Sequence, residues 1–167
     1  MDVLSIHPFI DSVHDVFDSM LGCEVHLKET RTLGSGAISS DIIGVIGLSG
    51  TAQGVVAVRL PEKTALAVIG KMVGAEFTTV DFSIIDGVGE LVNIVAGSAK
   101  GRLKGHSISV SLPTVVKGDI YRLSNLHNAL WLEVCFESSL GEFAVIVTLK
   151  QVANQQQEVV SEGANSR

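Results

Sequence analysis

Apolar and polar residues follow one another along this chain with two different periods, one helical and one extended. In three segments, apolar side chains recur every three or four positions, which predicts amphipathic helices. These segments are residues 6–21, 61–73 and 81–104. Pro61 at the start of the second segment and Gly74 after its end agree with helix boundaries there. We therefore expect three helices, of which the third is the longest.

Runs rich in valine, isoleucine and threonine lie between the helical segments and favour strands. They cover residues 24–33, 41–60, 106–118 and 131–150. A turn at Ser49-Gly50 divides the second run, and residues 138–141 divide the fourth, which predicts a hairpin in each. Pro113 breaks the third run or places it at an edge. Residues 35–40 are expected to be a loop, whereas residues 119–130 are compatible with a loop but less clearly so.

The order of these elements predicts the fold class. Because hairpins dominate, we expect an α+β fold of two layers, with a mainly antiparallel sheet and long helices packed on one face. Residues 1–150 are expected to form one domain. The polar residues 151–167 lack aromatic side chains and are predicted to be disordered, with a short partner-docking helix as the alternative.

Composition narrows the classes of function. The net charge is −6, with 12 Lys and Arg against 18 Asp and Glu, which does not favour a nucleic-acid partner. No apolar stretch reaches the roughly 18 residues that span a membrane. The first residues lack the basic region of a signal peptide, so a cytoplasmic protein with no membrane partner is expected. Cys23 and Cys135 are interpreted as reduced core thiols, with a single disulfide as the alternative.

At 100° per residue, the third helical segment divides its residues between two faces. The broad apolar face, expected to be buried, holds Ile84, Ile85, Val88, Leu91, Val92, Val95, Ala96, Ala99 and Leu103. The opposite face, called here the polar strip, holds Asp86, Glu90, Asn93, Gly97, Lys100 and Lys104. Glu90 and Asn93 are i and i+3 neighbours, so their side chains project together. Gly97 leaves bare backbone beside them.

Glycines are unexpected in this helix, because each interior glycine costs about 1 kcal/mol relative to alanine. Gly87 and Gly89 are predicted to lie in or before the first turn and Gly101 near the end, where the cost is smaller. Gly97 is expected in the helix interior, where the full cost applies. It would let the backbone or phosphate of another molecule approach the helix closely. The alternative is an ordinary solvated face that tolerates a glycine without any function.

Residues 86–93, D-G-V-G-E-L-V-N, followed by I-V-A-G-S-A-K, resemble the signature of the CheC/CheX/FliY phosphatases of bacterial chemotaxis. Residues 61–74 and 112–118 resemble the elements that flank the signature in that family, and the resemblance spans about residues 5–150. Only one copy of the signature is present. The first helix carries Asp15 and Asp18 where a second copy would need Glu and Asn. This difference favours the CheX branch, which has a single site per chain.

The resemblance implies a CheC-like fold and a phosphatase that hydrolyses the aspartyl phosphate of a phosphorylated CheY-type response regulator. In that role Asn93 would position the attacking water, and Glu90 would pair with the receiver's lysine. Asp86, Gly97 and Lys100 would contact the same partner. The chain itself would bind no cofactor or metal, because the receiver supplies Mg²⁺. The alternative function is a non-catalytic module that docks a receiver or a receptor-linked signalling partner.

The resemblance also implies a homodimer. The apolar strands expected at 55–60 and 143–150 give a physical reason, because an unpaired sheet edge of that kind must be paired or covered. We therefore expect a two-fold dimer that uses sheet or strand contacts and leaves the polar strips outward. The five histidines lack the spacing of metal ligands, so no metal site is predicted.

Overall fold

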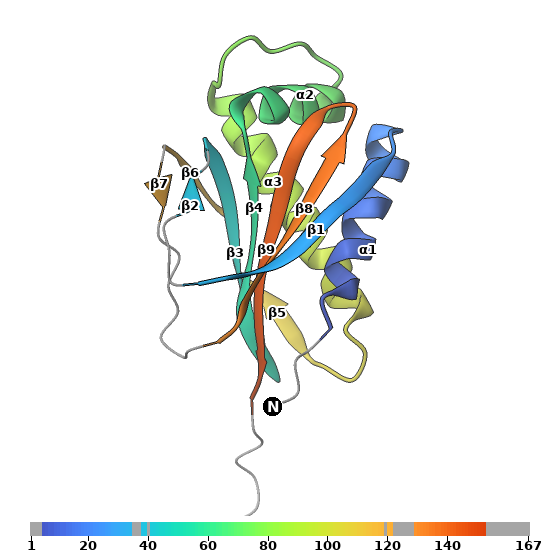
Figure 1. Ribbon diagram of the computed structural model, residues 1–167, viewed down its shortest axis with the longest axis vertical. Coiled ribbons are helices and arrows are strands. Elements are labelled where there is room, and N and C mark those ends of the chain that lie inside the picture. The colour runs from blue at the N-terminus through green and yellow to red at the C-terminus, as the bar shows by residue number, and fades with distance from the viewer. Residues whose placement is uncertain (1–4, 35–37, 40, 119, 122–128, 153–167) are drawn as a thin grey trace, which may run out of the picture.

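The computed structural model describes residues 5–34, 38–39, 41–118, 120–121 and 129–152. Figure 1 shows a twisted sheet with helices packed behind it. The helices are α1 (His7–Val16), its π-helical continuation η1 (Phe17–Leu21), α2 (Glu62–Val73) and α3 (Phe82–Arg102). The strands are β1 (Val25–Leu33), β2 (Ile38–Ser39), β3 (Ile42–Gly50), β4 (Ala52–Leu60), β5 (Ile108–Val110), β6 (Thr114–Lys117), β7 (Ile120–Tyr121), β8 (Trp131–Ser138) and β9 (Gly141–Gln151).

Seven strands form one sheet in the order β1-β8-β9-β4-β3-β5, and β6 also pairs with β3. All the pairings among the described strands are antiparallel, which confirms the predicted α+β class. The two expected hairpins form between β3 and β4 and between β8 and β9. The short strands β2 and β7 form a separate pair. β2 lies in a segment expected to be a loop and β7 in one compatible with a loop; two residues each are too few to show a period.

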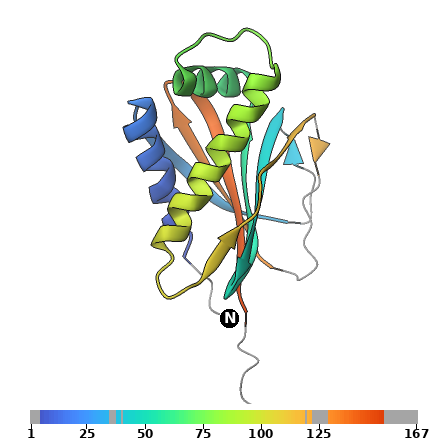
Figure 2. The ribbon, with the colours of Figure 1, turned by 180° about the vertical axis from the view of Figure 1, so that it is seen from behind.

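The main core lies between the sheet and the helices. Figure 2 shows α1 and α3 lying against the same face of the sheet, with α2 across one end. Three phenylalanines join α1 and η1 to the hairpin of β8 and β9. The ring of Phe143 stacks on Phe17 at 4.9 Å and on Phe136 at 5.3 Å between centroids. This packing holds α1 beside α3 and leaves the far side of α3 open to solvent.

The prediction that residues 55–60 and 143–150 form an unpaired edge is wrong. They belong to β4 and β9, which pair with each other. β4 also pairs with β3, and β9 also pairs with β8. Their apolar sequences instead reflect burial on both faces of the sheet. Ile43, Ala57 and Ile146 form a second buried cluster on the face away from the helices, called here the outer face. The edges are β1 at one end of the sheet and β5 and β6 at the other. Exposed charged residues on β1 disfavour pairing with another sheet.

Helix α3 begins as its sequence predicts. The carboxylate of Asp81 accepts a hydrogen bond of 3.2 Å from the backbone N–H of Ile84, which satisfies one of the free donors of the first turn. By length and composition alone, α3 would suffice to cross a membrane, and it is the one such helix within the described residues. Nine of its residues are buried against the rest of the fold, so core packing accounts for its apolar character.

Candidate functional site

The polar strip lies on the solvent side of α3, as the helical period predicts. Asp86, Glu90, Gly97 and Lys100 are exposed, and Asn93 is half-buried. The opposite face of the helix is buried except for Ile85, which is half-buried. Because α3 is packed along its length, the side chains of Glu90 and Asn93 project from a rigid support. Figure 2 shows this side of the helix toward the viewer.

The side chains of the polar strip have no internal partners. Within the described part of the chain, no side-chain hydrogen bond or ion pair involves Asp86, Glu90, Asn93 or Lys100. The carboxylate of Glu90 and the amide of Asn93 are therefore free to bind an external molecule. Lys100 lies in the last turn of α3, where a cation also interacts favourably with the helix dipole.

The four glycines of α3 differ in what their surroundings require. Gly87 lies in the second turn rather than the first, and it is buried. A Cβ added there would lie 2.4 Å from Cγ2 of the buried Ile69, so α2 can pack this closely only against a glycine. A Cβ at Gly97 or Gly101 would meet nothing within 4 Å. The internal packing therefore explains Gly87 and leaves Gly97 without a structural reason.

Two elements flank the polar strip. On one side lies α1, joined to α3 by an ion pair between Arg102 and Asp15. Because Asp15 is engaged in this contact, it is not a free acid like Glu90. On the other side run β6 and the segment that joins it to β5. There the side chains of Val115 and Pro113 lie 3.4 and 3.6 Å from the position that a Cβ of Gly89 would take.

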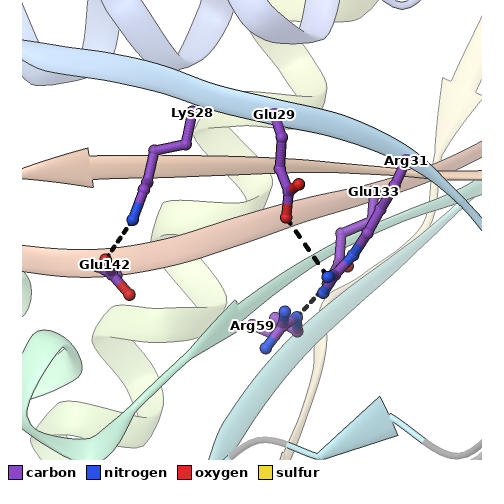
Figure 3. Close-up of polar contacts among 6 residues, drawn as sticks. All are labelled: Lys28, Glu29, Arg31, Arg59, Glu133 and Glu142. Atoms are coloured by element: carbon purple, nitrogen blue, oxygen red, sulfur yellow. Dashed lines mark hydrogen bonds and ion pairs between the residues drawn. The ribbon is translucent and has the colours of Figure 1, made fainter.

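A second cluster of charged side chains lies on the outer face of the sheet (Figure 3). Glu133 of β8 is only 1% exposed and accepts hydrogen bonds from Arg31 of β1, at 2.5 Å, and from Arg59 of β4. Hydrogen bonding to Glu133 raises the pKa of Arg31 above its ordinary value. The carboxylate thus has both oxygens occupied. We interpret this cluster as a structural tie between strands.

The sequence analysis missed this tie. Arg31 and Arg59 are 102 and 74 residues away from Glu133 in sequence, so no local pattern could reveal the contact. Alternation along β8 was the one available signal, because it places Glu133 on the face opposite Val134 and Phe136.

The remaining chemistry-bearing residues do not form a competing site. Cys23 and Cys135 are both half-buried, and the structure has no disulfide between them. Burial raises the pKa of the Cys135 thiol, with the nearby Glu133 acting in the same direction, so this thiol is a poor nucleophile. Among the described residues, no group of three or more His, Cys, Asp or Glu side chains could hold a metal ion.

Comparisons with known proteins agree with the motif and the fold. Residues 42–137 match the family model described as chemotaxis phosphatase CheX. The CheY-P phosphatase CheX of Thermotoga maritima is 30% identical over 121 residues, which cover 71% of this chain and 78% of that protein.

Solved structures share the fold. A CheC-like superfamily protein from a Shewanella species superposes with a TM-score of 0.80 and 27% identity, covering 90% of this chain and 99% of that one. A chain of the CheX–CheY–BeF3–Mg²⁺ complex from Borrelia burgdorferi has a TM-score of 0.75 and 24% identity, covering 89% of this chain and 100% of that one. The protein therefore belongs to the CheX family of the CheC-like chemotaxis phosphatases, which are phosphoprotein hydrolases.

Proposed function

We propose that this protein hydrolyses the aspartyl phosphate of a phosphorylated CheY-type response regulator, and that Asn93 and Glu90 are the residues that act. The observation that carries the proposal is the pair itself. Both side chains project from one rigid helix, and neither has a partner within the described residues. The Thermotoga maritima relative is named for activity on phosphorylated CheY, which supports the same substrate here.

The reaction needs positioning more than proton transfer. A water oxygen attacks phosphorus, the bond between phosphorus and the receiver's aspartate oxygen breaks, and inorganic phosphate leaves with a free carboxylate behind. That carboxylate is a good leaving group, so no strong base is required. The carbonyl of Asn93 accepts a hydrogen bond from the attacking water and holds it in line with the breaking bond. A neutral amide suits this task better than a second carboxylate, which would repel the phosphoryl oxygens.

Glu90 has a different task in the proposal. Its exposed carboxylate pairs with the receiver's lysine and fixes the register in which α3 enters the receiver's site. Asp86 and Lys100 contact the receiver at the two ends of the polar strip, and Gly97 lets the receiver's backbone approach. Mg²⁺ comes with the receiver, as the content of the Borrelia burgdorferi complex supports. The chain works in the cytoplasm, where response regulators are phosphorylated.

A homodimer is also proposed, on family resemblance alone. β4 and β9 are internal strands, so they offer no free edge for a dimer contact. A two-fold dimer should leave both polar strips accessible, since each must reach a receiver. Light scattering at micromolar concentration would give twice the chain mass if this is correct, and a monomeric mass would contradict it.

The test of the function is phosphate release. Each CheY-type receiver of the same organism would be phosphorylated with a small phosphodonor, and release would be followed with and without this protein. We expect at least one receiver to lose phosphate faster with the wild type, and not with a Glu90→Ala/Asn93→Ala double variant. A receiver that binds without faster release would identify a binding module. If no receiver binds, the proposal is wrong.

A further inference from the structure

Two large apolar side chains stand almost fully in solvent. Phe82 is 82% exposed and Leu112 is 89% exposed, whereas the other exposed large apolar residues in the described part of the chain range from 40% to 57%. Burying such a side chain is worth about 1.5–3 kcal/mol. A single exposed apolar residue is common and needs no explanation. Two of them beside one functional strip indicate a surface that a partner covers.

Phe82 stands at the N-terminal end of the polar strip. It is the first residue of α3 and precedes Asp86 by four positions, as Asp86 precedes Glu90. Residues spaced by four lie on the same side of a helix, so Phe82 continues the line of Asp86 and Glu90. A molecule that covers Glu90 and extends along α3 toward its start would also cover this ring.

Leu112 stands on the flank of the strip nearest Asn93. It directly precedes Pro113, whose ring packs where a Cβ of Gly89 would be, 3.6 Å away. Gly89 is four residues before Asn93 and lies on the same side of the helix. Ser111 still exchanges hydrogen bonds with Gly47 of β3, but the ladder is interrupted after it, where Pro113 has no N–H to donate. Leu112 is thereby turned out to solvent beside the strip.

We propose that Phe82 and Leu112 are two apolar anchors that hold the CheY-type receiver over Glu90 and Asn93 and contribute to the choice of receiver. The inference rests on the proposed function. The occupant is a receiver rather than a second copy of this chain because of charge. Self-pairing through this surface would bring the free carboxylates of Asp86 and Glu90 toward those of the other copy. A receiver offers a lysine and Mg²⁺ to the same carboxylates.

The experiment measures binding and turnover separately. The probe is a CheY-type receiver from the same organism, loaded with beryllofluoride and Mg²⁺ for binding and phosphorylated for turnover. The variants are Phe82→Ala, Leu112→Ala and the double, with Leu27→Ala as control. Leu27 is 41% exposed on the edge strand β1, away from α3 in the fold. Because all three residues are exposed, none of the variants should unfold the protein, and a thermal melt checks this.

We expect each anchor variant to weaken receiver binding about 10-fold, the scale of an interface hot spot, with near-additive loss in the double. KM should rise by a similar factor, while kcat at saturating receiver stays within about twofold. Leu27→Ala should change neither. Binding that depends on Phe82 and Leu112 without any phosphate release would support the anchors and overturn the phosphatase proposal.

Other outcomes would overturn the anchors. If both variants bind the loaded receiver within about twofold of the wild type while Glu90→Ala binds more weakly, the receiver docks on the polar strip without them. If the double variant changes the oligomeric mass in light scattering and receiver binding is unchanged, a second copy of this chain is the occupant. A loss in kcat with KM unchanged would assign these residues a role in the chemistry rather than in docking.

Discussion

Glu90 and Glu133 are glutamates on opposite faces of the molecule, and their surroundings differ in every respect. Glu90 projects from α3 into solvent and has no partner within the described residues. Glu133 is 1% exposed on the outer face of the sheet and is held by two arginines from different strands (Figure 3). One carboxylate has its hydrogen-bonding capacity unused, and the other has it satisfied inside the fold.

The difference separates a carboxylate that is free to bind a partner from one that is committed to the fold. A buried charge is stable only when it is paired, so Glu133 cannot be offered to a partner without breaking its bonds to Arg31 and Arg59. Glu90 can accept a cation at little cost to the fold. The more elaborate charge cluster is therefore the less functional one, and an isolated exposed pair on a rigid helix is the better candidate for the site.

The largest effect expected from the polar strip is loss of turnover in Asn93→Ala. Removal of the amide should lower turnover of a phosphorylated receiver at least about 100-fold, the scale for one lost positioning group. Stability should hold or rise slightly, because alanine is the better helix former. Receiver binding should change little. Phosphate release and a thermal melt measure both effects, and near-normal turnover in the folded variant would remove Asn93 from the mechanism.

A matched pair of substitutions tests the comparison directly. Glu133→Gln should lower the free energy of unfolding by roughly 2 kcal/mol, since it removes the buried negative charge that both arginines contact. This is below the loss for a fully buried pair, because Arg31 is 49% exposed. Glu90→Gln should leave stability within about 0.5 kcal/mol of the wild type. It should weaken receiver binding instead, and this loss should shrink at high salt. Urea unfolding and binding titrations measure the two quantities.

Glu29→Gln is the control on the outer face. Glu29 pairs with Arg31 at 3.4 Å but is 57% exposed, so its loss should cost less than about 1 kcal/mol. Turnover at saturating receiver should be unchanged in Glu133→Gln, because the tie lies on the face away from the helices. The comparison of Glu90 with Glu133 would fail if Glu90→Gln destabilised the protein more than Glu133→Gln does.

Alanine substitutions at two glycines of α3 should change the stability of the protein by smaller amounts, and in opposite directions. Gly87→Ala places a methyl against the buried Ile69, and we expect a net loss of about 1 kcal/mol after the gain in helix propensity. Gly97→Ala meets open space and should stabilise the protein by roughly 0.5–1 kcal/mol. Gly97→Leu should be equally well folded but bind the receiver more weakly because of its bulk. Unfolding and binding measurements on the same samples would reveal any departure from this pattern.

The helical period predicted the two faces of α3 because burial of a helix depends on positions within one segment. It could not explain Gly87, because the reason is a side chain of α2, Ile69. It also placed Gly87 and Gly89 in or before the first turn, whereas both lie beyond it. The positions of these glycines relative to the helix start were readable from Asp81, which caps the helix.

The order of the strands in the sheet was the second feature that the sequence could not predict. Two hairpins were predicted correctly, but local sequence does not state how hairpins join. β9 lies between β8 and β4, so the apolar runs of β4 and β9 mark central strands rather than an edge. A continuous apolar run is also typical of a strand that is buried on both faces, and β4 and β9 are strands of this kind. The Glu90 and Asn93 pair needed no such long-range knowledge, because it lies within one helix.

The smallest expected effect concerns an exposed ion pair on the same outer face. Lys28 lies 2.6 Å from Glu142, and its hydrogen bond holds the pKa of that carboxyl below the ordinary value. Since the folded pKa is the lower one, any stabilisation is present above the unfolded pKa and is lost as pH falls through the folded pKa. A carbon NMR titration should therefore give a Glu142 midpoint below the ordinary glutamate value of about 4.3 in the wild type. In Lys28→Met the midpoint should return to that value, and salt should reduce the difference, because both side chains are accessible to solvent. Equal midpoints in the two proteins would show that this contact, unlike the tie at Glu133, has no measurable consequence in solution.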